Sequence, residues 1–369
     1  MRILHTTFAL GCGGIETFLV SLANSQCEAG HDVEICTIST AGDSEMARGR
    51  LNPDIRQLSA GKHDLISGFK AIGRMAEIIR RGNYDIVHIH GQFYYYFLSV
   101  LRAPSHTRFV YTVHNDAAKE NSRWDKLFTG VKKHWFRSGR LNAVTISTSS
   151  QTSFAEYYGK STPSTLIPNG IVPVHCKSDS PDPLAQWRIS EKTKVFVNPG
   201  RIYVQKNQIE LCRAFSMLLS GDNPPDIQLI IAGPPEDHTI LAAMQQFFSD
   251  RIRYIGQQTD LPVMLSAADA MIMPSLWEGM PIALLESIGS QCIPICTRAG
   301  GMADIIDCGC GIPIESASAQ DIAKAVMEFC NTPEDKKIQM RKTCTEVFAN
   351  YGIEACADKY MSLYTALSM

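Results

Sequence analysis

Short apolar runs of strand length alternate with longer amphipathic segments along most of this chain. In the first part of the chain, segments of helical periodicity at 15–29, 69–81 and 152–158 separate apolar, β-branched runs at 3–7, 33–39, 86–90, 109–114 and 144–147. Strands that alternate with helices form parallel sheets covered on both faces. The pattern therefore predicts an α/β fold with a doubly wound sheet.

A polar, proline-containing break is followed by a second set of such segments. The break begins at Pro168-Asn169-Gly170 and continues to residue 183. After it, we expect strands at 195–198, 227–232, 253–255, 270–273 and 293–296, with helices at 208–219, 240–248, 261–267 and 282–288. A chain of 369 residues is also too long for one ordinary core. We therefore expect two Rossmann-like domains, residues 1–172 and 173–350, facing each other across a cleft.

Composition argues against several classes of protein. Charged residues make up 20% of the chain and the net charge is −2, so no overall attraction to nucleic acid is expected. The twelve cysteines are scattered through long periodic segments and fit no zinc-site spacing, which indicates reduced thiols. Residues 1–8 resemble a first strand more than a signal peptide, and no apolar run is long enough to span a membrane. We expect a cytoplasmic protein that binds no metal.

The loops after the predicted strands carry the candidate binding residues, because ligands of parallel sheets gather at the carboxyl ends of strands. In the first domain, Gly13 and Gly14 open a helix and leave N–H groups for an anion, although a tight turn without a ligand fits equally well. The dinucleotide fingerprint GxGxxG is missing there. His114 ends a strand, where its ring can reach a substrate. His88 and His90 share one strand face, and either can be an interior residue.

In the second domain, cations and carboxylates follow successive strands. Arg201 and Lys206 flank a helix start and suit a diphosphate, although two solvated surface cations are the alternative. Glu278 falls on a loop and Glu286 on the following helix, with about 7.5 Å of helical rise from Pro281 to Glu286. The two carboxylates could hold different parts of one extended ligand, or they could simply face solvent.

These features together resemble the GT4-type retaining glycosyltransferases of the GT-B fold, including those of bacterial surface polysaccharides. The order of the motifs matches along most of the chain: Gly11-Cys12-Gly13-Gly14, His114, Pro168-Asn169-Gly170, Gly200-Arg201 with Lys206-Asn207, Pro274-Ser275 with Glu278 to Glu286, and Gly300-Gly301. The spacing of Glu278 and Glu286 is the most specific part. The resemblance implies transfer of a sugar from a nucleotide-sugar, expected to be a UDP-sugar, to a saccharide or lipid-linked acceptor, with no metal or other cofactor.

The resemblance also implies roles for individual residues. Glu286 would bind the ribose hydroxyls, Glu278 the donor sugar, and Arg201 with Lys206 the diphosphate. His114 would contact the donor sugar from the first domain, where Gly13 and Gly14 would approach phosphate or acceptor. The other residues expected around the donor are Gly200, Gly233, Gly279, Met280, Pro281 and Ile282. The family more often has an aromatic residue and glycine where Met280 and Pro281 stand, which leaves the donor sugar open.

Two further features concern the acceptor and the chain end. Residues 119–140 contain seven Lys or Arg against two Asp or Glu, with Trp124, Leu127, Phe128, Val131 and Trp135 at helical spacing. An amphipathic helix on anionic lipid fits this pattern, and so does a helix packed on the sheet. The hypothesis that follows is peripheral contact with anionic lipid at the inner face of a membrane. The resemblance suggests that a last helix, within residues 351–369, crosses back onto the first domain.

Two other functions stay open at this point. A nucleotide-sugar epimerase could use the same architecture, with acid and base groups close to the sugar. A non-catalytic subunit that binds a nucleotide-sugar is the second alternative. An NAD dehydrogenase is disfavoured because the fingerprint is missing.

Overall fold

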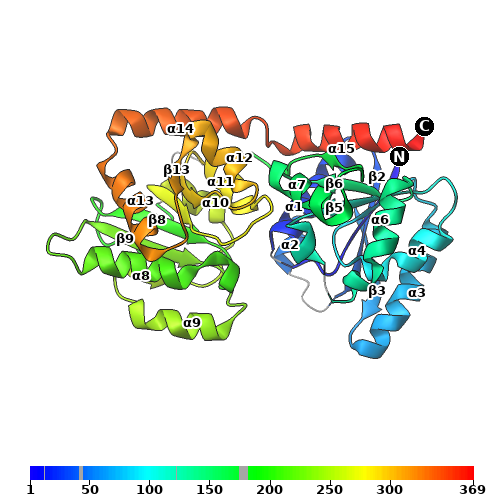
Figure 1. Cartoon of the computed structure of the whole chain (residues 1–369), viewed down its shortest axis with the longest axis horizontal. Coiled ribbons are helices and arrows are strands. Elements are labelled where there is room, and N and C mark those ends of the chain that lie inside the picture. Colours follow the sequence, from blue (N-terminus) through cyan, green and yellow to red (C-terminus); the bar gives the residue numbers. More distant parts are fainter. Residues whose placement is uncertain (12, 41–44, 122, 174–181) are drawn as a thin grey trace. The chain divides into compact units, whose positions relative to one another are not determined.

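The computed structural model describes residues 1–11, 13–40, 45–121, 123–173 and 182–369, without the side chains of residues 45, 46 and 65. Cys12 of the predicted glycine-rich motif therefore lies outside the described residues. The chain divides into two compact units (Figure 1). Unit 1 comprises Met1–Val172 and Tyr351–Met369, and unit 2 comprises Pro173–Asn350.

Unit 1 is built on a parallel sheet of seven strands in the order β3-β2-β1-β4-β5-β6-β7. The strands are β1 (Arg2–Thr7), β2 (Asp32–Ser39), β3 (Arg56–Lys62), β4 (Ile86–Ile89), β5 (Arg108–Val113), β6 (Asn142–Thr145) and β7 (Thr165–Leu166). The helices are α1 (Gly14–Glu28), α2 (Glu45–Gly49), α3 (Leu65–Gly82), α4 (Phe97–Arg102), α5 (Ala117–Glu120), α6 (Thr129–Arg137), α7 (Thr148–Tyr158) and α15 (Ile353–Ser368), with 3-10 turns η1 (Phe93–Tyr95) and η2 (Asp125–Phe128).

The two faces of the unit 1 sheet differ in polarity because side chains alternate along each strand. One face carries Leu4, Val87 and Tyr111, which join the large apolar core that includes residues of α3, α4 and α6. The opposite face carries His5 and His88, which are in register on β1 and β4. Gln26 of α1 bonds to His5, and Tyr364 of α15 bonds to His88.

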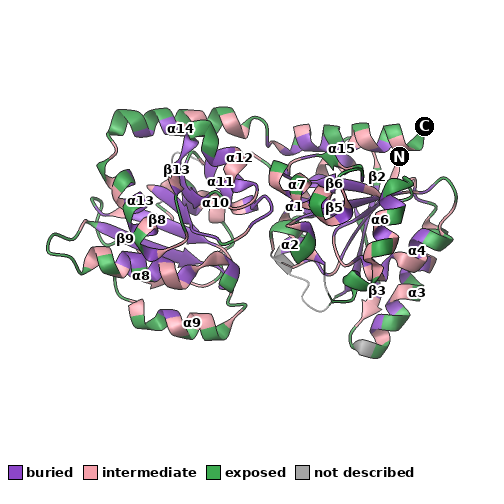
Figure 2. Ribbon diagram, in the orientation of Figure 1, coloured by how far each residue is buried: buried purple, intermediate pink, exposed green. Residues whose placement is uncertain are grey.

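Unit 2 has a parallel sheet of six strands in the order β10-β9-β8-β11-β12-β13. The strands are β8 (Lys194–Pro199), β9 (Ile227–Ala232), β10 (Ile252–Tyr254), β11 (Ala270–Met273), β12 (Ile293–Thr297) and β13 (Ile312–Ile314). The helices are α8 (Gln208–Leu219), α9 (His238–Met244), α10 (Leu261–Ala267), α11 (Ile282–Gly289), α12 (Met302–Ile305), α13 (Ala319–Asn331) and α14 (Glu334–Phe348), with short turns η3 (Val204–Lys206), η4 (Gln245–Phe247) and η5 (Ile306–Cys310). The central strands of both sheets are buried, whereas the edge strands β3 and β7 of unit 1 are largely exposed or half-buried and most helices expose one face (Figure 2).

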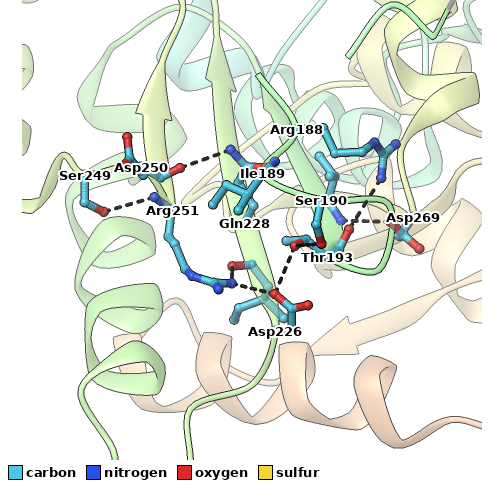
Figure 3. A network of polar contacts seen from close by, with 12 residues as sticks. Arg188, Ile189, Ser190, Thr193, Asp226, Gln228, Ser249, Asp250, Arg251 and Asp269 are labelled. Atoms are coloured by element: carbon cyan, nitrogen blue, oxygen red, sulfur yellow. Dashed lines mark hydrogen bonds and ion pairs between the residues drawn. The ribbon is translucent and has the colours of Figure 1, made fainter. Parts of the chain in front are cut away.

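A polar network closes the amino-terminal edge of the unit 2 sheet (Figure 3). Gln228 bonds to three backbone groups, of Trp187, Ile189 and Asp250. Asp226 accepts from the Thr193 hydroxyl at 3.0 Å and pairs with Arg251 at 2.7 Å. These contacts satisfy the polar groups where the strands begin, so the edge where the strands end is left for ligands.

The bounds of some strands and helices differ from the predictions where polar residues begin the element. Strand β6 ends at Thr145, and α7 begins at Thr148, because Ser147 caps the helix and pairs reciprocally with Ser150 in a capping box. The strand predicted at 144–147 is therefore displaced by two residues, whereas the helix predicted at 152–158 begins four residues earlier and ends where predicted. Strand β3 was not predicted because Arg56–Lys62 lacks a long apolar run.

Both interpretations of residues 119–140, a helix on anionic lipid and a helix packed on the sheet, assumed one continuous helix, and that assumption is wrong. The segment forms the end of α5, the turn η2 and the helix α6. Trp135 and Lys132 are buried, whereas Trp124 and Leu127 are 59% and 73% exposed. The apolar residues at helical spacing thus do not share one face, because the chain turns between Trp124 and Thr129.

Two expectations about the whole chain can be compared with the described residues. Each of the ten cysteines among them is a free thiol. No helix in the described part of the chain is both long and apolar enough to cross a membrane.

Candidate functional site

The candidate donor site lies in unit 2, where the order of the strands reverses. Strand β8 lies between β9 and β11, and β11 begins the opposite half of the sheet. Loops that leave the two central strands of such a sheet turn toward opposite faces and leave a crevice for a ligand. Lys206 follows β8, and Glu278 follows β11.

Lys206 and Glu278 form a buried ion pair at this reversal point. The Lys206 ammonium (Nζ) lies 2.6 Å from Oε1 of Glu278, and the two side chains are 13% and 7% exposed. The amide of Gln205 donates to Oε2 of the same carboxylate at 3.2 Å and to the carbonyl of Trp277 at 2.7 Å. Gln205 was missed in the sequence because an amide next to a lysine gives no signal of its own. The Lys206 ammonium and the Glu278 carboxylate thus provide one cation and one hydrogen-bond acceptor, and each can exchange the other for a group of a bound ligand.

Gly200 and Gly233 bring the loops after β8 and β9 into backbone contact. Their φ angles are 143° and 157°, in the region that favours glycine. A Cβ atom on Gly233 would lie 2.0 Å from the carbonyl oxygen of Gly200, and one on Gly200 would lie 3.2 Å from Cε of Lys206. The two glycines therefore allow the packing that supports the Lys206 side chain.

Gly300 and Gly301, after β12, fix the loop that carries Glu278. Gly300 has a φ of 61°, and a Cβ atom there would lie 1.8 Å from the carbonyl oxygen of Glu278. The N–H of Gly301 donates to the carbonyl of Gly279 at 2.6 Å. The close backbone packing at these two glycines thus sets the position of the Glu278 backbone.

The other predicted donor residues surround the start of α11. Gly279, Met280, Pro281 and Ile282 are buried, and Ile282 is the first helical residue. Glu286 lies on the same helix and is half-buried. Glu278 and Glu286 therefore lie on a loop and on the next helix as expected, while their roles stay predictions.

Arg201 is oriented toward Glu236 and forms an ion pair with it. Both side chains are more than 40% exposed, and such exposed pairs stabilise a protein by about 0–1 kcal/mol. The structure therefore does not group Arg201 with Lys206, and joint binding of one diphosphate would require Arg201 to leave Glu236.

In unit 1, His114 follows β5 and is 8% exposed. Its Nε2 lies 2.9 Å from Nδ1 of His90, and His90 Nε2 lies 3.4 Å from Nδ1 of His5. Burial lowers the pKa of His114 to about 3 and that of His5 to about 4, and it holds the pKa of His90 well below its ordinary value. These rings are therefore neutral near pH 7.

A half-buried acid that the sequence did not reveal, Glu120, lies close to His114. The Glu120 carboxylate accepts from the Tyr111 hydroxyl at 3.1 Å and from the N–H of Asn115 at 3.2 Å, next to His114. Burial raises the pKa of Glu120 to about 7, against the attraction of the Lys132 ammonium. Lys132 lies over the Tyr111 ring at 4.3 Å, and burial lowers its pKa to about 8. Lys132, one of the seven cations of residues 119–140, is thus an interior residue.

Gly13 and Gly14 begin α1 as predicted. Gly13 is the residue before the helix, with a φ of −86°, and its carbonyl accepts from the N–H of Thr17 at 3.0 Å. A Cβ atom on Gly13 would clash with the flexible carboxylate of Glu16. A role of these glycines in binding phosphate or acceptor stays a prediction.

Three histidines of unit 1 also have the spacing of a metal site. Ring nitrogens of His5, His88 and His90 all lie within 4.8 Å of one another. However, both nitrogens of His88 already have partners, because Nε2 lies 2.7 Å from the Thr112 hydroxyl and Nδ1 lies 2.6 Å from the Tyr364 hydroxyl. The hydrogen-bonded arrangement thus accounts for His88 without a metal ligand role.

Two family profiles match successive parts of the sequence. Residues 12–174 match Glycosyltransferase Family 4, and residues 180–346 match Glycosyl transferases group 1. Together they cover nearly all of both units. The chain belongs to the group 1 glycosyltransferases. It is therefore a transferase, as the motifs predicted.

Curated relatives of this glycosyltransferase include two bacterial enzymes. It is 26% identical over 318 residues to the UDP-Gal:alpha-D-GlcNAc-diphosphoundecaprenol alpha-1,3-galactosyltransferase of Escherichia coli, covering 81% of this chain and 80% of that one. It is 22% identical over 298 residues to the N-acetyl-alpha-D-glucosaminyl L-malate synthase of Bacillus anthracis, covering 79% and 77%.

Solved structures of glycosyltransferases have the same fold. Anabaena HepE in complex with UDP-glucose matches 99% of this chain and 100% of its own with a TM-score of 0.83 at 16% identity. The likeness shows that this glycosyltransferase has the GT-B fold, and the predicted fold class is confirmed.

Proposed function

We propose that this glycosyltransferase transfers a sugar from a UDP-sugar to a saccharide or lipid-linked saccharide in the synthesis of a surface polysaccharide, with retention of the anomeric configuration. The observation that carries the proposal is the buried pair of Lys206 and Glu278 at the reversal point of the unit 2 sheet. A cation beside an acceptor suits a ligand with an anionic diphosphate and a neutral, hydroxyl-rich sugar. The E. coli relative, whose name specifies UDP-Gal and a diphosphoundecaprenol acceptor, supports the same substrate classes.

In this proposal, the catalytic contribution of the protein is mainly electrostatic. Negative charge builds on the diphosphate as its bond to the sugar breaks, and Lys206 stabilises that charge together with Arg201 once it leaves Glu236. Glu278 accepts hydrogen bonds from sugar hydroxyls, and Glu286 accepts from the ribose. The acceptor hydroxyl attacks from the face that the diphosphate leaves, and the diphosphate takes its proton. No metal or other cofactor is required by this scheme.

The basic segment supports a peripheral site of action at the inner face of a membrane. Trp124 and Leu127 are exposed, and the exposed cations Arg123 and Lys126 lie beside them in the sequence. Exposed apolar side chains next to cations suit an anionic lipid surface, where each Lys or Arg contributes about 1 kcal/mol. A lipid-linked acceptor would be presented at such a surface.

Transfer can be tested with purified protein and a panel of nucleotide-sugars. We expect one UDP-sugar to raise the melting temperature, since a ligand that binds the folded state stabilises it. The same donor should then support transfer to a diphosphate-linked saccharide, with the product linkage assigned by NMR. Undiminished transfer by both Lys206→Ala and Glu286→Ala would contradict the proposed site.

The two alternative functions predict other outcomes. Incubation of the labelled donor without acceptor should give slow hydrolysis, whereas an epimerised donor would indicate an epimerase. A non-catalytic subunit would bind the donor and yield no product with any acceptor pool.

A further inference from the structure

Four buried side chains form a continuous hydrogen-bonded chain that ends at His114. Gln26 of α1 contacts His5 of β1, His5 contacts His90 after β4, and His90 contacts His114 after β5. The three distances are 2.7 Å, 3.4 Å and 2.9 Å. Gln26 and His5 are fully buried, and His90 is 4% exposed. The links thus run from the interior of unit 1 to the residue expected to meet the donor sugar.

The hydrogen bond between Gln26 and His5 determines which nitrogen donates in each of the following hydrogen bonds. Oε1 of Gln26 is a carbonyl oxygen and can only accept, so His5 must donate from Nε2. A neutral imidazole has one donor and one acceptor nitrogen, so Nδ1 of His5 accepts from Nε2 of His90. Nδ1 of His90 then accepts from Nε2 of His114. Each ring donates toward Gln26, and the proton of His114 is placed on Nε2.

We propose that His5 and His90 are positioning residues that hold His114 in the neutral Nε2–H tautomer, so that its Nδ1 lone pair accepts a hydrogen bond from a ligand hydroxyl. That this ligand is a substrate of sugar transfer rests on the proposed function, whereas the tautomer is a property of the free protein. In this tautomer the His114 ring already has its acceptor nitrogen in place, so no change of tautomer is needed when the ligand binds. Metal sites offer a comparison for residues that orient a histidine without touching the ligand. Loss of such a residue there typically lowers metal affinity or activity about 10- to 100-fold.

A second polar branch lies beside the chain and supplies a matched control. His88 lies against His90 with ring centroids 4.0 Å apart and ring planes tilted by 35°, and its nitrogens contact Thr112 and Tyr364. Tyr360 of α15 reaches the Thr112 hydroxyl at 3.2 Å. Tyr360→Phe therefore removes a buried hydroxyl from this branch without touching the links from Gln26 to His114.

The tautomer can be measured directly by long-range ¹H–¹⁵N NMR of the histidine rings in the free protein, with His114 assigned from the His114→Gln spectrum. We expect His5, His90 and His114 each to show a protonated Nε2 and a bare Nδ1. The same spectrum with Nδ1 protonated on His114 would overturn the proposal. So would one zinc ion per chain bound to His5 and His90 in the purified protein, because both facing nitrogens would then be ligands.

Variants separate positioning from simple loss of stability. His90→Leu breaks the chain, and we expect His114 to populate both tautomers and kcat to fall about 10- to 100-fold. His90→Gln keeps one donor and one acceptor and should restore the single tautomer and most of kcat. Tyr360→Phe should leave both unchanged. If His90→Gln and His90→Leu are equally impaired while both remain folded, the positioning role is wrong. If neither the parent protein nor any variant transfers sugar, the proposed function fails. The NMR spectrum of the free protein still tests the proposed tautomer in that case.

Discussion

Lys206 and Glu278 are 72 residues apart in the sequence and form an ion pair of 2.6 Å that is almost completely buried. Each residue reaches this point from a different central strand of the unit 2 sheet. Burial of a charge is unfavourable unless it is paired, so each of the two side chains stabilises the other in the free protein. The ion pair thus holds the Lys206 ammonium and the Glu278 carboxylate in place before any nucleotide-sugar binds.

Removal of Lys206 should therefore cost both stability and binding. We expect Lys206→Met to lower the free energy of unfolding by about 3 kcal/mol, because the Glu278 carboxylate is left buried without its cation. The double variant Lys206→Met/Glu278→Gln should recover part of that loss, since neither charge remains. Urea titration of all variants measures the effect, and a double variant as unstable as the sum of the single variants would argue against the coupling. Donor binding should be weakened in every one of them.

Glycine at position 300 should be essential for the Glu278 loop. Gly300→Ala places a Cβ atom 1.8 Å from the Glu278 carbonyl oxygen, so the loop must move. Gly256 provides the control, because its φ of 71° is similar but no atom lies within 4 Å of an added Cβ. Gly256→Ala should cost only the conformational term of about 1–2 kcal/mol. We expect Gly300→Ala to be less stable than Gly256→Ala and to bind the nucleotide-sugar donor more weakly. Calorimetry measures both the stability and the donor affinity. Equal losses in the two variants would show that the contact with Glu278 does not matter.

Acid should destabilise unit 1 before unit 2. Burial lowers the pKa of His5, His88, His90 and His114 in the folded state. As the pH falls below about 6.5, the unfolded chain binds protons that the folded rings do not, and each ring costs up to about 1.4 kcal/mol per pH unit. Glu120 acts in the opposite sense, because its raised pKa of about 7 lets the folded state bind a proton first, but it is one group against four.

The measurement is hydrogen exchange with mass spectrometry between pH 7.5 and pH 5.5, resolved for the two units. We expect the opening free energy of unit 1 to fall steeply and that of unit 2 to change little. His5→Gln should reduce the slope by about one proton, whereas His238→Gln, at an exposed position of unit 2, should not. Parallel curves for the two units would contradict this account.

The sequence predicted the architecture well because both sheets consist of apolar strands that alternate with helices. Strands β9 and β11 and helices α8 and α10 have the predicted bounds. The missed elements lack that signal. Helix α14 buries only Lys337, Met340 and Cys344 among its fifteen residues, so it shows no strong apolar stripe, and β3 has a largely polar sequence.

The candidate site was predicted in part, for a related reason. Glu278 and Glu286 are separated by seven residues within one motif, so their spacing can be read from the chain. The contact between Lys206 and Glu278 depends on which strands are neighbours in the sheet, and sequence spacing does not contain that information. The same holds for His5 and His90, which are 85 residues apart and meet only because β1 and β4 are paired.

Binding to anionic membranes should depend on the exposed residues of segment 119–140. Trp124→Ser/Leu127→Ser removes two side chains that are 59% and 73% exposed, so it should weaken binding to anionic vesicles with little change in stability. Arg123→Gln/Lys126→Gln should lower affinity about tenfold or more, given about 1 kcal/mol per cation. Met217→Ser, at a 45% exposed site on α8, is the control and should bind normally. Vesicle co-sedimentation measures all four proteins. Equal recovery of the parent protein with neutral and anionic vesicles would remove the electrostatic basis of membrane contact, because the cations are attracted only to the anionic surface.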